Sequence, residues 1–469
     1  MNMEQIRENK MGVMPVKKLL INMSLPMMIS MIIQALYNVV DSIFVAKISE
    51  NALAAVSLSF PVQNMMVAIA VGTGVGINAL LSKSLGERNF KESNRAANNG
   101  IFLGLLSYLV FLIFGLTLVK TYFLSQTNDI EIVEYGTSYL TIICSMSIGL
   151  FGQITFERLL QSTGKTIYNM ITQGIGAVIN IILDPILIFG LLGMPKMGVA
   201  GAAVATVTGQ LVATILGLIY NLKANPEITI KIRGYRPNMN TIKKIYSVGF
   251  PSIIMLSISS ITTYSINNIL LKFSSTATAV FGVYFKLQSF VFMPVFGLNN
   301  GMVPIISFNY GARKKERLIK TIKLSIEFAV GIMLIGFVVF QVFPEKLLLL
   351  FNASEEMLSI GIPALRIISL SYIFAGFSVV TGSVFQAFGN GMYSLLVSIS
   401  RQLVVLVPVA YFLSLSGNIN LVWWSYPIAE IASLIVSIIF LKSIYSYKIK
   451  PIEEIQTINE KVKEMSYVN

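Results

Sequence analysis

Four polar residues inside an apolar stretch near the start of the chain are the first candidates for chemistry. They are Gln34, Tyr37, Asn38 and Asp41, within the run from Ile21 to Val45. Their spacing of i, i+3, i+4 and i+7 places them on one face of a helix that is long enough to cross a bilayer. A carboxylate there costs about 2.5–3.5 kcal/mol on insertion scales. We therefore interpret this face as the wall of a water-filled cavity that handles a cation and forms part of a substrate cavity.

A second acid lies in a later apolar stretch, Asn180-Ile-Ile-Leu-Asp184-Pro185. Asn180 and Asp184 are one helical turn apart, and Thr206 in a glycine-rich stretch is expected at similar depth. Two carboxylates in one cavity of low dielectric repel, so we expect them to take up a proton, or a Na⁺ ion at Asp41, Asn180 and Asp184. The structural alternative is that each aspartate caps a helix end or pairs with a basic residue.

Composition indicates an all-α integral membrane protein and excludes several chemistries. The 469 residues are 55% hydrophobic and only 12% charged, against about 25% charged in soluble domains. There is no histidine, and the single cysteine, Cys144, lies in an apolar run. Histidine metal sites, Ser-His-Asp triads and disulfide frameworks are therefore excluded. We expect no cofactor, no resident metal and no enzymatic activity.

Twelve apolar segments are predicted to span the membrane. They cover residues 20–45, 52–80, 97–121, 136–157, 167–190, 198–221, 245–271, 277–305, 318–343, 360–385, 393–414 and 421–443. Of the 35 Lys and Arg residues, 27 fall at the two termini, in the loops after even-numbered segments, or near the adjoining ends of the segments. The positive-inside rule then predicts cytoplasmic termini and explains the net charge of +13 without a nucleic acid partner. We expect a monomer embedded in the bilayer, with no obligate protein partner.

An internal repeat divides the chain into two halves. At a constant offset of 225 residues, Pro26 matches Pro251, and the glycines at 72 and 76 match those at 297 and 301. Six helices per half put both halves in the same orientation, so we predict two six-helix bundles related by a pseudo-twofold axis along the membrane normal. The expected organisation is an N-terminal lobe over 1–221, a linker over 222–244, a C-terminal lobe over 245–446 and a cytoplasmic tail over 447–469. The tail carries an apolar face and could lie on the membrane surface.

Charged residues of the second half do not repeat those of the first. Asp41 and Asp184 match Ile266 and Val409, whereas Lys286 and Glu430 fall within predicted spans. A lysine and a glutamate in neighbouring helices could form a buried pair, and both are candidates for the substrate cavity. Apart from Lys120 at the end of the segment 97–121, no Lys or Arg is predicted inside the spans of the first half.

Several motifs together resemble the multidrug and toxic compound extrusion (MATE) family over essentially the full length, and a bacterial MepA-like branch in particular. They are Pro26, the segment 34–41, Leu85-Gly-Glu-Arg-Asn89 with its twin Tyr310-Gly-Ala-Arg-Lys314, Gln161-Ser-Thr-Gly164 with its twin Gln386-Ala-Phe-Gly389, and the segment 180–185. The resemblance implies a drug exporter driven by H⁺ or Na⁺ that works by alternating access in the bacterial inner membrane. It also implies that Asp41, Asn180, Asp184 and Thr206 form the coupling site. The family's other type of coupling acid, in the seventh helix, has no counterpart here.

Two alternatives remain open. A flippase for a lipid-linked precursor on a related scaffold would favour several basic residues in the central cavity, and only Lys286, Arg366 and Arg401 are candidates. A membrane enzyme would need catalytic residues that the composition does not offer. Transport of a labelled lipid precursor, or turnover of a lipid by the purified protein, would distinguish these from drug export.

Overall fold

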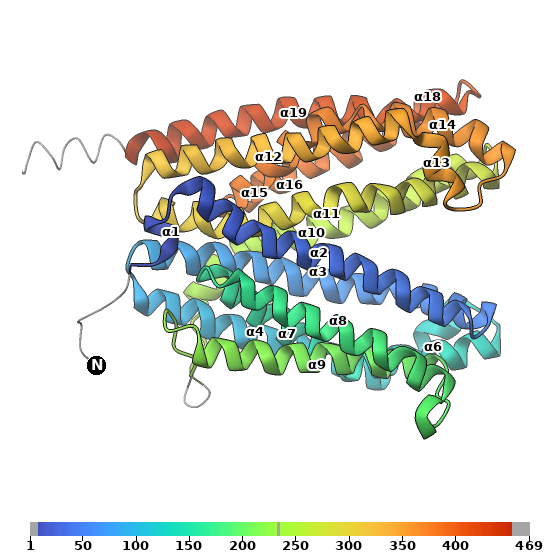
Figure 1. Ribbon diagram of the computed structural model, residues 1–469, viewed down its shortest axis with the longest axis horizontal. Coiled ribbons are helices and arrows are strands. Elements are labelled where there is room, and N and C mark those ends of the chain that lie inside the picture. The colour runs from blue at the N-terminus through green and yellow to red at the C-terminus, as the bar shows by residue number, and fades with distance from the viewer. Residues whose placement is uncertain (1–7, 232–234, 453–469) are drawn as a thin grey trace, which may run out of the picture. The chain divides into compact units, whose positions relative to one another are not determined.

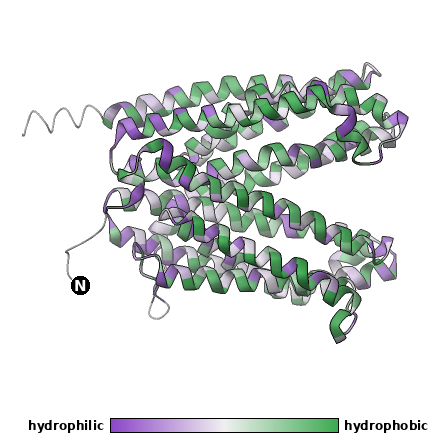
Figure 2. Ribbon diagram, viewed as in Figure 1, coloured by the Kyte–Doolittle hydropathy of each residue, from purple (hydrophilic) through white to green (hydrophobic). Residues whose placement is uncertain are grey.

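The computed structural model describes residues 8–231 and 235–452 (Figure 1). All regular secondary structure in these two ranges is helical, which confirms the all-α class. Hydrophobic residues run along the lengths of the helices, and hydrophilic residues are concentrated towards their ends (Figure 2). The predicted tail beyond residue 452 lies outside the described residues.

Within the described ranges, ten helical segments are long and apolar enough to cross a membrane without a break. They are α2 (Val16–Ala46), α3 (Glu50–Gly86), α4 (Phe90–Thr117), α8 (Thr166–Phe189), α9 (Val199–Lys223), α10 (Met239–Leu271), α11 (Ser275–Gly311), α12 (Lys315–Val342), Gly391–Ser414 and Ile419–Ile452. The segment Gly391–Ser414 consists of α16 (Gly391–Ile399), the π-helix η2 (Ser400–Leu406) and α17 (Val407–Ser414). The last segment contains α18 (Ile419–Trp423), α19 (Ser425–Ile444) and the π-helix η3 (Tyr445–Ile449). Short helices complete the fold: α1 (Lys10–Val13), α5 (Val119–Gln126), η1 (Leu191–Gly193) and α13 (Pro344–Leu349).

Two further spans are bent, which the sequence did not predict. The segment predicted at 136–157 is α6 (Ile130–Ser145) followed by α7 (Ile148–Ser162), with a bend of 42°. The segment predicted at 360–385 is α14 (Glu355–Ser369) followed by α15 (Tyr372–Ala387), with a bend of 52°. At each break a tight i→i+3 bond replaces the helical pattern, from Ser147 N to Cys144 O and from Ser371 N to Ile368 O. The two breaks occupy matching positions of the repeat, since the first helix of each pair ends at Ser145 and at Ser369, 224 residues apart. Counting each pair as one span gives the twelve membrane helices expected from the sequence.

Contacts between Cα atoms divide the chain into two compact units. The N-terminal unit consists of residues 25–81 and 89–253, and the C-terminal unit consists of 1–24, 82–88 and 254–469. Helices α2, α3 and α10 therefore each contribute to both units. The lobe and linker boundaries drawn from the sequence stay a prediction.

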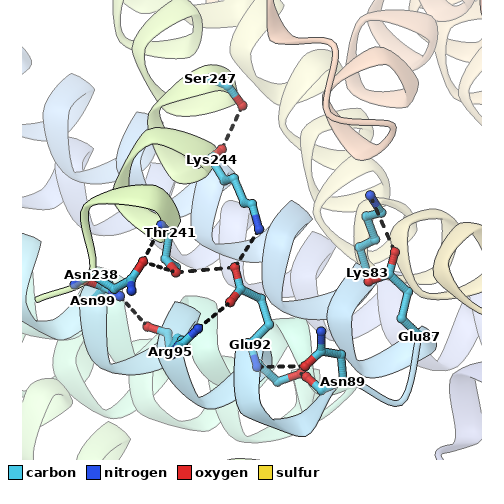
Figure 3. Close-up of polar contacts among 11 residues, drawn as sticks. Lys83, Glu87, Asn89, Glu92, Arg95, Asn99, Asn238, Thr241, Lys244 and Ser247 are labelled. Atoms are coloured by element: carbon cyan, nitrogen blue, oxygen red, sulfur yellow. Dashed lines mark hydrogen bonds and ion pairs between the residues drawn. The ribbon is translucent and has the colours of Figure 1, made fainter.

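Within the N-terminal unit, Glu92 joins the start of α4 to the start of α10 (Figure 3). Its carboxylate accepts a bond from Lys244 Nζ at 2.9 Å and one from Thr241 Oγ1 at 3.3 Å. It also lies 3.8 Å from Arg95 Nη1, and Asn89 caps α4 by accepting from Glu92 N. These bonds fix where α10 begins after the connection between the two halves.

Arg317, which matches Glu92 at the offset of 225, likewise bonds two segments together within the C-terminal unit. Its Nη2 donates to the carbonyls of Met11 and Met14 at 2.9 and 2.8 Å, and Lys314 Nζ donates to Gly12 O at 2.8 Å. The segment that leads into α2 is thereby fastened to the start of α12. Glu92 and Arg317 are 225 residues apart, so the internal repeat includes these two hydrogen-bonding positions as well as the spans.

Candidate functional site

Asp41 and Asp184 lie together inside the N-terminal unit. Asp41 is on α2 and Asp184 is on α8, where its side chain has no exposure to solvent. The two carboxyl groups are close enough to interact electrostatically. Oδ1 of Asp41 and both carboxylate oxygens of Asp184 are buried, and none accepts a hydrogen bond from another described group. Neither carboxylate can donate to the other unless one of them carries a proton.

Asn180 and Thr206 stand beside this pair on α8 and α9. Asn180 is one turn before Asp184, only 3% exposed, and its Nδ2 donates to Thr206 Oγ1 at 3.2 Å. This bond turns the amide so that Asn180 Oδ1 is left buried without a hydrogen-bond donor among the described residues. The two helices pack closely because glycines meet there: a Cβ on Gly209 would overlap the carbonyl oxygen of Gly176.

The polar face predicted on α2 continues from Asp41 towards the start of the helix. Gln34 accepts a bond from Gln173 Nε2 of α8 at 3.3 Å. Tyr37, between these positions, is within electrostatic range of Asp41 and Asp184. The backbone of Asn38 is helical, and its side chain lies outside what the structure describes. Thus α2 and α8 face each other through polar groups at two depths.

Glu157 on α7 belongs to the same polar column and was missed from the sequence. Its Oε1 accepts from Gln153 Nε2 at 2.9 Å and from Thr172 Oγ1 of α8 at 3.5 Å. Tyr37 is within electrostatic range of Glu157 as well as of the aspartate pair. Thr172 and Asp184 are twelve residues apart on one helix, so Glu157 lies about 18 Å further along α8. The signal was available, because Gln153 and Glu157 stand four apart at the end of a predicted span.

The expectation that no basic residue lies inside the first-half spans is wrong. Arg158 is within α7, is 9% exposed and donates from Nη1 to Gln161 Oε1 at 2.8 Å. Its stem packs against Gly74, where an added Cβ would lie 2.7 Å from Arg158 Cγ. The helix α7 continues to Ser162, five residues beyond the predicted end of this span, and therefore includes Arg158. In the described part of the chain, neither Asp41 nor Asp184 forms an ion pair with a basic residue, so the structural alternative of a paired aspartate is not what the structure contains.

The two candidate residues of the second half are not paired with each other. Glu430 of α19 forms its ion pair with Arg401 of η2, at 3.3 Å from Nη1 to Oε2. Lys286 of α11 is exposed, and its ammonium lies 6.0 Å from the ring centroid of Phe351. The suggested Lys286–Glu430 pair is therefore wrong, because the side chain of Lys286 projects towards the segment after α13 instead.

The N-terminal site has the chemistry of a cation site. It gathers two carboxylates, an amide oxygen and a hydroxyl, which are the oxygen ligands that Na⁺ and other hard cations prefer. A buried carboxylate without a donor or a counter-charge is strongly destabilised. Either a proton on one aspartate or a cation among these oxygens removes that penalty. Among the described residues there is no group of three or more His, Cys, Asp or Glu side chains that would hold a transition metal.

Fold and site together define a multipass helical membrane protein with a duplicated scaffold and a buried cluster of oxygen-bearing side chains in one half, a design typical of membrane transporters. The MatE family model matches residues 26–186 and 251–412. These two segments cover more than half of the 469 residues, and the chain belongs to this family of multidrug efflux transporters. They begin at residues 26 and 251, which is the 225-residue offset of the internal repeat.

Individual relatives agree with this assignment. The multidrug export protein MepA of Staphylococcus haemolyticus is 26% identical over 416 residues, 88% of this chain and 90% of that protein. A multidrug resistance MATE family transporter solved in an outward-facing conformation is 26% identical, with a TM-score of 0.89 over 96% of this chain and 100% of that one. A MOP superfamily transporter from Pyrococcus furiosus, for which reversed polarity of the binding pocket suggests a different function, is 27% identical, with a TM-score of 0.85 over 94% of this chain and 99% of that one. The relatives that these comparisons name are transporters, and the MepA-like resemblance is confirmed.

Proposed function

We propose that the protein is a cation-coupled antiporter that exports amphipathic, often cationic drugs by alternating access. The coupling ion is H⁺ or Na⁺, and its site consists of Asp41, Asn180, Asp184 and Thr206. The names of the relatives support drug export, and the chemistry of the N-terminal unit supports ion coupling. No cofactor takes part in this proposal.

One observation carries the proposal: the Asp184 side chain is fully buried, and both of its oxygens lack a hydrogen-bond donor. Such a group destabilises a packed core, because a buried acceptor without a donor costs about 1–3 kcal/mol, and more when it is charged. The cost is tolerable if the group is regularly occupied by an ion. Asp41 adjoins it and supplies the second charge.

The proposed cycle uses this site as a switch. A cation that arrives from outside neutralises the aspartate pair, which removes the repulsion between α2 and α8 and lets the two helices approach. The change in α2 alters the face that carries Gln34, Tyr37 and Asn38, and the drug is released outward. The cation then leaves to the cytoplasm, the pair regains its charge, and the cavity again attracts a cationic drug.

The proposed location follows from the same design. We place the protein in the bacterial inner membrane with both termini in the cytoplasm, on the basis of the 27 basic residues found on one side. Its partners are drugs and the surrounding lipid, and we propose that it works as a monomer.

Reconstitution in proteoliposomes tests the proposal. Efflux of a fluorescent drug is measured with a pH gradient alone and with a Na⁺ gradient alone, for the wild type and for Asp41→Asn. We expect one of the two gradients to drive efflux by the wild type, and neither to drive it by the variant at equal protein content. Full drug resistance in cells that carry Asp41→Asn would contradict the proposal.

A further inference from the structure

The start of α2 belongs to a different unit from the rest of that helix. Residues 1–24 are part of the C-terminal unit, whereas residues 25–81 are part of the N-terminal unit. The helix itself is continuous from Val16 to Ala46. Asp41 comes 17 residues after Ser24, which is about 26 Å along the helix axis. One helix therefore joins the aspartate pair of the N-terminal unit to the C-terminal unit.

The short helix α1, directly before α2, is bound at its C-terminal end by Arg317 of α12. Arg317 Nη2 donates to the carbonyls of Met11 and Met14 at 2.9 and 2.8 Å. Asn309 of α11 donates from Nδ2 to Met11 O at 3.0 Å and accepts from Arg317 Nε at 3.0 Å. The last carbonyls of a helix have no partner within it, and bonds from a charged donor are the stronger kind. Arg317 is thus oriented by Asn309 and satisfies acceptors that α1 leaves open.

The bonds of Arg317 belong to a longer anchored segment, residues 11–24. Lys314 Nζ donates to Gly12 O at 2.8 Å. At the other end, Ser24 Oγ donates to Leu298 O of α11 at 3.2 Å, and a Cβ on Gly301 would lie 2.6 Å from Ser24 Cα. Four apolar side chains of the segment have no exposure, namely Met11, Leu19, Leu20 and Met23. The anchored segment is therefore attached to α11 and α12 at both of its ends.

The internal repeat anchors its second leading helix in the same exchanged way. The first part of α10, residues 239–253, lies in the N-terminal unit, and the remainder lies in the C-terminal unit. Glu92, the match of Arg317, accepts a bond from Lys244 at this start. A Cβ on Gly76 would overlap the carbonyl oxygen of Ile245. Each leading helix is therefore held at its start by a charged side chain from the other half of the chain.

This exchange gives a shift of α2 a route into the C-terminal unit. In the proposed cycle, a cation at Asp41 and Asp184 moves α2. Its backbone hydrogen bonds make the helix stiff, and Pro26 removes one of them close to the anchored segment. With a free end, the shift would be lost within the N-terminal unit. Because the end is bonded to α11 and α12, the shift acts on those helices.

We propose that Arg317 is a positioning residue for the coupling between ion and drug. By holding the carbonyls of Met11 and Met14, it makes a shift of α2 at Asp41 act on the C-terminal unit. This inference rests on the proposed function, which supplies the cation at Asp41 and the release of the drug. It gives a role in transport to a side chain at the opposite end of α2 from the aspartate pair.

The test measures how much the cation changes the affinity for a drug. Binding of rhodamine 6G, a permanently cationic dye, to the purified protein in nanodiscs is followed by fluorescence anisotropy. Titrations are done at high and low pH, and with and without Na⁺, and the ratio of the two dissociation constants is the coupling factor. The variants Arg317→Gln, Arg317→Lys and Lys314→Gln remove different parts of the anchor. Lys320→Gln is the control, because Lys320 is an exposed lysine of the same helix.

We expect the cation to weaken dye binding to the wild type about tenfold, and Lys320→Gln should keep this factor. In Arg317→Gln the factor should fall close to one, with Arg317→Lys and Lys314→Gln in between, while every variant still binds dye and cation. If Arg317→Gln does not fold, Lys314→Gln decides by the same measure.

An anchor that serves stability alone would lower the melting temperature and leave the coupling factor unchanged. That result in the folded variants of Arg317 and Lys314 would overturn the inference, as would loss of cation binding itself in Arg317→Gln. Failure of the proposed function has a different signature, since the dye affinity of the wild type would then respond to neither cation. That outcome would contradict the antiporter and the role of Arg317 together.

Discussion

The glycine at the end of α3 offers a sharp test of how the C-terminal unit is packed. A Cβ on Gly86 would overlap the carbonyl oxygen of Phe308 and would lie 2.8 Å from Phe308 C. Its repeat partner Gly311 is packed just as tightly, since a Cβ there would overlap Lys83 O and lie 3.0 Å from Lys83 C. Ordinary contact begins at 3.4 Å, so the carbon contact alone requires the backbone at Gly86 to move by at least 0.6 Å.

We therefore expect Gly86→Ala to destabilise the protein. The clashing atoms belong to backbone and cannot rotate away, and overpacking of this kind costs about 1–3 kcal/mol. Alanine in place of a helical glycine is otherwise favourable by up to about 1 kcal/mol. Gly331→Ala on α12 is the matched control, because nothing lies within 4 Å of a Cβ there.

The assay is the melting temperature of the purified protein in one detergent. The predicted order is Gly331→Ala at or above the wild type, with Gly86→Ala and Gly311→Ala below it. Melting temperatures of Gly86→Ala and Gly311→Ala equal to that of Gly331→Ala would refute the reasoning, because the helices would then be free to separate at no cost.

Three further predictions concern the N-terminal unit. Thr206→Val removes a neutral oxygen from the proposed cation site. The cation concentration for half-maximal drug efflux should therefore rise, while the maximal efflux rate is unchanged. Thr208→Val is the control, because it loses only a hydrogen bond to Val204 O of its own helix. Glu157→Gln should slow gradient-driven efflux, because it removes the carboxylate at the end of the polar column that lies beside Thr172, and unchanged rates would exclude Glu157 from the ion's route. Glu92→Gln should lower stability by about 1 kcal/mol at low salt and by less at high salt, since its partners Lys244 and Arg95 are partly exposed, and a loss that is independent of salt would contradict this.

Hydropathy and the repeat were sufficient to predict the spans, because the bilayer requires about 20 apolar residues per helix whatever the tertiary contacts are. The bends were not predictable in this way. The residues around the breaks, Ser145–Ser147 and Ser369–Ser371, remain compatible with a continuous helix. Only the packing of the two halves of each bent span decides that the tight turn is preferred.

The candidate site was predictable where a single helix determines the geometry. Asn180 and Asp184 share a face by their spacing, and the structure brings them to Asp41 and Thr206 as expected. Pairs of side chains on different helices were harder to predict from the sequence, because the rotation and depth of each helix are set by packing. For that reason Glu430 was matched with Lys286 instead of Arg401, and Glu157 was overlooked although it bonds to Thr172 on the neighbouring helix.

The central claim is that the aspartate pair binds the coupling ion, and equilibrium ion binding tests it most directly. Bound ²²Na⁺ and proton uptake are measured on the purified wild type, Asp41→Asn, Asp184→Asn and the control Asp129→Asn, whose asparagine can still cap α6 as Asp129 does. The account predicts that the wild type and the control bind the same cation and that both other variants lose it. Undiminished binding of that cation by Asp41→Asn and Asp184→Asn would contradict the account.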